Sequence, residues 1–207
     1  KTSVMAIWLL ARAFRGAGSV LPRRLIYVVD RRVVVDQATA EAERISTALS
    51  QDDPVASELR SRLGLQPELG LPILPISTLR GGRADDLEWT YDAAATAIVV
   101  GTIDMIGSRL LFSGYRMSQW SRSMQAGLIG CDSLIVLDEA HLSPAFCEAV
   151  PRALQLQVSM SGVNEVPAAR FLPLSATLGN LNDERTFRLE PADENDPIVV
   201  RRTGRLE

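Results

Sequence analysis

Short apolar runs alternate with longer amphipathic segments along this chain. Continuous apolar, β-branched runs predict buried strands, and apolar residues at every third or fourth position predict helices. This alternation is typical of a mostly parallel sheet that helices cover on both faces. Strands are predicted at 25–29, 73–78, 97–101, 134–137 and 171–174. Helices are predicted at 2–15, 33–49 and 144–160, with a short one ending at Leu63 and another ending at Leu111.

Composition narrows the class of protein without giving a function. The 207 residues have room for one domain, or for one domain and a short extension. No run of about 18 apolar residues occurs, so we expect no membrane span, and no signal-peptide pattern is present. Two cysteines, Cys131 and Cys147, are too few for a disulfide framework and fit a reducing cytoplasm. A net charge of -3 excludes a protein that coats nucleic acid by charge alone, but it permits local contacts from arginines.

Polar or glycine-containing groups follow each predicted strand. Because ligands of parallel sheets bind beyond the carboxyl ends of the strands, these groups are the candidate functional residues. They are Asp30-Arg31-Arg32, Arg80-Gly81-Gly82, Gly101-Thr102, Asp138-Glu139-Ala140-His141 and Ser175-Ala176-Thr177.

The stretch from Leu134 to His141 carries the clearest chemistry. Two adjacent carboxylates, Asp138 and Glu139, end an apolar strand, where they repel each other and need a cation or a proton. In a phosphate-binding site that cation is Mg²⁺, bound by the Asp, while a neighbouring residue orients the attacking water. Asp138 is therefore the candidate metal ligand and Glu139 the candidate base. The alternative is that Asp138 caps the following helix.

Three further groups have a structural interpretation beside the functional one. Lys1-Thr2 has the residue types that end a phosphate-binding loop, where the Lys neutralises phosphates and the hydroxyl binds Mg²⁺. The pair gains weight only from its combination with Asp138. His141 is the only histidine, and a lone histidine is more often a hydrogen-bonding partner than a catalyst. Ser175 and Thr177 are compatible with a simple turn as well as with a role beside the acidic site.

Taken in order, these groups resemble the motifs of superfamily 2 helicases, over Lys1 to about Leu189. Lys1-Thr2, Asp138-Glu139-Ala140-His141 and Ser175-Ala176-Thr177 are similar to motifs I, II and III. Asp30-Arg31-Arg32, Arg80-Gly81-Gly82 and the run from Val100 to Asp104 are similar to motifs Ia, Ib and Ic. Asp30 differs from the Pro or Thr common at the start of motif Ia. The stretches 77–82, 100–112 and 137–143 together resemble the CRISPR-associated type I helicase–nuclease of the G (formerly U) subtype.

The resemblance implies a RecA-like P-loop domain at 1–189, followed at 190–207 by a linker toward a second motor domain. It implies an ATP hydrolase with Mg²⁺ that moves 3′ to 5′ on single-stranded DNA and is recruited by an RNA-guided CRISPR surveillance complex. A separate HD nuclease domain would degrade the DNA, and one histidine is too few for its metal centre. The second motor domain is also outside this chain.

The resemblance also assigns roles by position. Lys1 and Thr2 would hold phosphate and Mg²⁺, Asp138 would bind Mg²⁺ and Glu139 would activate water. His141, Ser175 and Thr177 would couple the nucleotide site to DNA. The residues expected to face the DNA backbone are Arg31, Arg32, Gly81, Gly82 and Thr102, with a solvated turn as the alternative, evenly weighted for Arg32.

Lys1 would stand inside the phosphate-binding loop, so the strand before that loop would precede it. We then expect two neighbouring strands of the sheet to lack a partner between them, and the chain alone to be inactive in ATP hydrolysis and DNA unwinding.

Other functions stay open. Another superfamily 2 translocase, such as a restriction or remodelling motor, shares the same nucleotide residues. A non-catalytic DNA-binding adaptor is a third possibility, against which the Asp138–Glu139 pair argues because adjacent acids need a cation. A P-loop metabolic kinase explains neither Ser175-Ala176-Thr177 nor Arg80-Gly81-Gly82.

Overall fold

The computed structural model describes residues 1–15, 21–65, 72–81, 87–114, 117–160 and 167–175, with the backbone alone for 158–160. Contacts divide the chain into a compact unit, Lys1–Ala176, and a second unit, Thr177–Glu207. The second unit lies outside the described residues, as does the domain boundary predicted at residue 189. None of the described helices has the length and apolar character that crossing a membrane requires.

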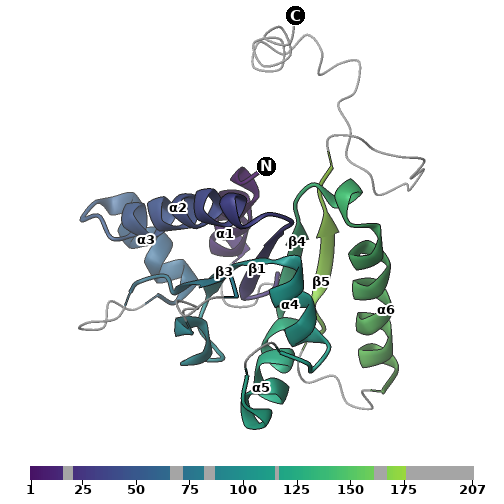
Figure 1. Ribbon diagram of the computed structural model, residues 1–207. Helices are drawn as coiled ribbons and strands as arrows, with labels where there is room; N and C mark the ends of the chain where they lie inside the picture. Colours follow the sequence, from purple (N-terminus) through teal and green to yellow (C-terminus); the bar gives the residue numbers. More distant parts are fainter. Residues whose placement is uncertain (16–20, 66–71, 82–86, 115–116, 161–166, 176–207) are drawn as a thin grey trace, which may run out of the picture. The chain divides into compact units, whose positions relative to one another are not determined.

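The described residues form an α/β fold built on five parallel strands (Figure 1). The strand order is β2-β3-β1-β4-β5, so β1 lies at the centre, hydrogen-bonded to β3 on one side and to β4 on the other. The expected interruption between two neighbouring strands is wrong for the described sheet, because every strand is paired with the next one in the order. The strands are β1 (Arg24–Val29), β2 (Ile76–Leu79), β3 (Ala97–Thr102), β4 (Ser133–Leu137) and β5 (Arg170–Pro173).

Helices cover both faces of the sheet, and each face has its own apolar core. Alternate residues of one strand point to opposite faces, so Leu25 and Tyr27 pack with the first three helices while Ile26 and Val28 pack with the last three. The helices of the first face are α1 (Ser3–Arg15), α2 (Arg32–Leu49) and α3 (Pro54–Leu63). Those of the second face are α4 (Ile103–Leu110), α5 (Gln119–Gly130) and α6 (Pro144–Met160), and two 3-10 turns complete the elements, η1 (Glu88–Thr90) and η2 (Ala140–Leu142).

The predicted strands are all present, and their ends lie within one residue of the prediction except for the start of β2. β2 begins at Ile76 instead of Ile73. The physical reason is Pro75, which lacks an amide hydrogen and enters the ladder only as an acceptor, from the Ile98 amide at 3.0 Å.

Two helical features do not follow from the apolar pattern alone. In α1 the buried residues are Met5, Trp8, Leu9 and Ala13, whereas the apolar side chain of Ile7 is 64% exposed, so apolar character alone does not mark the buried face. Helix α5 was not predicted, because its first half is polar and its buried residues begin only at Gln125. Ser118 accepts a hydrogen bond from the Ser121 amide and is the sequence feature that marks its start.

The connections that leave β1 and β4 lead to opposite sides of the sheet. After β1 the chain passes through α2 and α3 to β2 at one side of the sheet, and after β4 it passes through α6 to β5 at the other side. Such a switch point leaves a crevice between the carboxyl ends of the two strands, where α/β proteins bind their ligands. Asp138 follows β4 directly at this crevice.

Alanine substitutions at two glycines are expected to change the free energy of unfolding in opposite directions. A β-carbon at Gly101 in β3 would lie 3.0 Å from Ile106 Cδ1 and 3.2 Å from Leu79 Cβ, whereas none of the described atoms lies within 4 Å of one at Gly127 in α5. We expect Gly101→Ala to lower the free energy of unfolding by about 1–3 kcal/mol through overpacking. Gly127→Ala is expected to raise it by about 0.5–1 kcal/mol, because alanine restricts the unfolded chain. Denaturant titration of both variants measures the changes, and equal signs would contradict this packing.

Candidate functional site

The acidic pair at the end of β4 is held by backbone bonds on both sides. The Asp138 amide donates to the Val28 carbonyl of β1 at 2.9 Å, and the Ala140 amide donates to the Leu174 carbonyl beyond β5, also at 2.9 Å. Glu139 between them has φ 50° and ψ 47°, a left-handed conformation that costs a non-glycine residue about 1 kcal/mol or more. The chain thus turns sharply after β4 and presents both carboxylates at the crevice.

The side chain of Asp138 accepts two hydrogen bonds and forms one ion pair. Tyr27 Oη donates to Oδ2 at 2.8 Å, and the Glu139 amide donates to Oδ1 at 2.8 Å. Lys1 Nζ lies 3.3 Å from the same Oδ1 and also contacts Glu139 Oε1. The helix-cap interpretation of Asp138 is not what the structure shows, because the residue before η2 is Glu139 and its side chain makes no cap bond.

Lys1 supplies the positive charge that the two adjacent acids require. It stands immediately before α1 and is the only lysine in the sequence. The sequence disfavours a non-catalytic adaptor only if a bound cation is needed to neutralise Asp138 and Glu139. Because Lys1 neutralises the two carboxylates within the chain, the pair is also compatible with an adaptor.

His141 and Ser175, predicted to act together, are in contact. His141 Nδ1 lies 3.0 Å from Ser175 Oγ and 3.4 Å from Glu139 Oε2. The histidine thus joins the end of β4 to the segment after β5. Thr177, the third predicted coupling residue, lies outside the described residues.

The remaining predicted metal ligand, Thr2, lies beside Lys1, and its carbonyl accepts from the Met5 amide in the first turn of α1. Among the described residues, no group of three or more His, Cys, Asp or Glu side chains could hold a metal ion. An all-protein cage is therefore absent from this part of the chain. One carboxylate and one hydroxyl still fit Mg²⁺, which commonly takes its other ligands from water and substrate phosphates.

The residues predicted to face DNA lie along the same carboxyl edge. Arg31 is exposed, with Nε 3.9 Å from Asp30 Oδ2, and Arg32 begins α2 as an exposed residue. Gly81 has φ 77°, and a β-carbon there would lie 3.9 Å from Arg32 Nη2. The segment after β2 therefore lies against the start of α2.

Thr102 has a structural role in addition to its predicted one. Its side chain is 6% exposed, and its hydroxyl caps α4 by accepting from the Met105 amide at 3.4 Å. A contact between Thr102 and DNA stays a prediction. Gly82 lies outside the described residues.

Sequence reasoning missed Tyr27, the phenol that donates to Asp138. Burial in the centre of the sheet raises the pKa of Tyr27 above its ordinary value, and the bond to Asp138 raises it further. The phenol therefore stays neutral and remains a donor. The available clue was a tyrosine inside an otherwise aliphatic run, because a buried phenol usually has a hydrogen-bonding partner.

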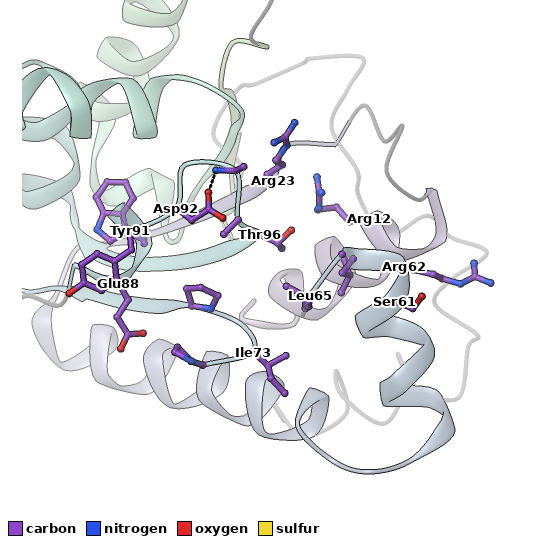
Figure 2. A pocket seen from close by; sticks show the side chains of 17 residues that line it. Arg12, Arg23, Ser61, Arg62, Leu65, Ile73, Glu88, Tyr91, Asp92 and Thr96 are labelled. Atoms are coloured by element: carbon purple, nitrogen blue, oxygen red, sulfur yellow. Dashed lines mark hydrogen bonds between the residues drawn. The ribbon is translucent and has the colours of Figure 1, made fainter. Parts of the chain in front are cut away.

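A cavity of about 650 Å³ lies at the opposite, amino-terminal edge of the sheet (Figure 2). Two of its arginines are paired within the protein: Arg23 Nε lies 3.0 Å from Asp132 Oδ2, and Arg62 Nε lies 2.6 Å from Glu58 Oε1. This cavity is separate from the acidic site. Residues that line it include Arg12, Arg23, Arg62, Ile73, Trp89 and Thr96.

No model of a known protein family matches this chain, and no significantly similar curated protein was found.

Proposed function

We propose that this chain is the first, RecA-like motor domain of a superfamily 2 DNA helicase, which binds and hydrolyses ATP with Mg²⁺ to move on single-stranded DNA. The observation that carries the proposal is the meeting of Lys1, Asp138 and Glu139 at the topological switch point. These three side chains come from segments more than 130 residues apart, and each has the chemistry that its helicase motif requires.

In this proposal each side chain has one task. Lys1 leaves the carboxylates and neutralises the β- and γ-phosphates of ATP. Asp138 and Thr2 would hold Mg²⁺, and the ion would supply positive charge for the transferred phosphoryl group. Glu139 orients and activates the attacking water, and the His141–Ser175 contact links Glu139 to the segment after β5.

DNA binding is supported by the position of the other predicted residues on the sheet. Arg31, Arg32 and Gly81 follow β1 and β2 at the carboxyl edge that also carries Asp138. Arginines supply charge to a phosphate backbone, and a glycine permits its close approach. The finer assignment, to the helicase–nuclease of type I CRISPR interference, rests on the resemblance of residues 77–82, 100–112 and 137–143. Its partners would be the RNA-guided surveillance complex and the HD nuclease domain.

A non-catalytic adaptor is the second candidate, because Lys1 neutralises both carboxylates within the chain, without a bound metal. In that case the pair is a permanent ion pair, and the domain binds DNA without turning over ATP. Another superfamily 2 translocase, of restriction or remodelling type, shares the nucleotide chemistry and differs in its substrate.

ATP hydrolysis by the full-length protein, with and without single-stranded DNA, tests the proposal. We expect Mg²⁺-dependent turnover that DNA stimulates, because the DNA-facing residues and the acidic pair lie on one edge of the sheet. Turnover that ignores DNA would indicate a different ATPase, and no turnover would favour the adaptor. Double-stranded DNA of matched length is the control that separates a single-strand translocase from a remodelling motor.

A further inference from the structure

Tyr27 is the one polar side chain in the middle of the central strand. β1 reads Arg-Leu-Ile-Tyr-Val-Val, and all six of its residues are buried. Tyr27 is fully buried on the face that α1, α2 and α3 cover, and its hydroxyl reaches Asp138 Oδ2 at 2.8 Å. A buried phenol in this place is a specific arrangement, because phenylalanine would fill the same space without requiring a partner.

The sheet register explains how the phenol reaches the carboxylate. Tyr27 is paired with Val136 of β4, and Asp138 comes two residues after Val136, directly beyond the end of β4, where its amide still bonds to the Val28 carbonyl of β1. Residues two apart point to the same face, so the Tyr27 side chain extends along the sheet toward the Asp138 carboxyl group. Since β1 is held by partners on both sides, the position of the phenol is fixed by the centre of the sheet.

The two carboxylate oxygens of Asp138 have different partners. Oδ2 accepts from Tyr27, whereas Oδ1 accepts from the Glu139 amide and faces Lys1 Nζ at 3.3 Å. Rotation of the carboxyl group would break the bond to the phenol. Oδ1 is thereby held on the side where Lys1 lies, which is the side of the proposed nucleotide.

We propose that Tyr27 is a positioning residue for the metal site: its hydroxyl holds Asp138 Oδ2 so that Oδ1 is presented toward Lys1 as the Mg²⁺ ligand. The inference rests on the proposed function, since it assumes that Asp138 binds Mg²⁺ with a nucleotide. Groups that hydrogen-bond to metal ligands typically change metal affinity about 10- to 100-fold when they are removed.

The test is equilibrium binding of a fluorescent, non-hydrolysable ATP analogue to the full-length protein, titrated with Mg²⁺. For Tyr27→Phe we expect the Mg²⁺ concentration at half-maximal binding to rise about tenfold. Binding of the analogue without Mg²⁺ should stay unchanged. Tyr27→Met, which also lacks the donor but is flexible enough to fill the space, must give the same shift and serves if Tyr27→Phe does not fold.

Val29→Ala is the matched control. Val29 lies in the same strand, faces the same core and is 1% exposed, but it makes no contact with Asp138 through a polar group. The substitution loosens packing and should lower the melting temperature while leaving the Mg²⁺ midpoint in place. An equal midpoint shift in Val29→Ala, or no shift in either Tyr27 variant, would overturn the positioning role while the proposed function stands. Wild-type protein that shows no Mg²⁺-dependent binding would overturn both.

Discussion

Glu139→Gln is expected to lower ATP turnover by at least about 100-fold while leaving binding of Mg²⁺ and ATP nearly unchanged. A positioned base contributes about 10²- to 10⁴-fold to a reaction, and glutamine keeps the size of the side chain without the ability to accept the proton. Glu139 is suited to this task because it follows Asp138 in a left-handed turn and its carboxylate contacts Lys1.

The measurement is single-turnover hydrolysis by the full-length protein, with nucleotide binding measured in parallel. Glu148→Gln is the matched control, since Glu148 lies on α6, is exposed and pairs with Arg152 at 2.6 Å. That substitution removes the same charge at a distance from the site and should leave turnover unchanged. Retained turnover in Glu139→Gln would remove Glu139 from the proposed chemistry, and lost nucleotide binding would assign it a structural role instead.

The fold was predictable because its determinants are local. Continuous apolar runs such as 97–101 indicate strands buried on both faces, and the structure confirms a parallel sheet between two layers of helices. The polar groups after the strands could be picked out for the same reason, because the carboxyl ends of parallel strands share one edge. The contacts among these polar groups could not be predicted from the sequence. Lys1 and Asp138 lie 137 residues apart, and their distance depends on which strands are neighbours.

The strand order is what the sequence could not provide. β1 pairs with β4 and not with β2, its successor in the chain, and this pairing brings Tyr27 next to Asp138. A local pattern contains no information about such a pairing, so Tyr27 was counted only as part of an apolar run. The buried face of α1 also depends on contacts that a local pattern does not contain. Ile7 has the hydrophobicity of a core residue, but the helix rotation is set by Met5, Leu9 and Ala13 against the sheet.

A lysine that contacts both carboxylates has one of two roles, as a phosphate ligand or as a permanent counter-ion. The two roles differ in their tolerance of arginine. A counter-ion needs only a positive charge, whereas a phosphate ligand at this position acts as a compact ammonium that the bulkier, planar guanidinium replaces poorly. Lys1→Arg therefore distinguishes a phosphate ligand from a counter-ion, whereas Lys1→Ala removes both functions at once.

Lys1→Ala is expected to lower the turnover of the full-length protein by about 100- to 1000-fold, because it removes a preorganised charge from the developing phosphoryl group. It also leaves Asp138 and Glu139 to repel each other, so the melting temperature should fall. Lys1→Arg should recover most of the melting temperature and little of the turnover, as measured by thermal unfolding and by hydrolysis in Mg²⁺. Recovery of turnover together with stability would instead make Lys1 a counter-ion, and the adaptor would then explain the acidic pair better than the motor does.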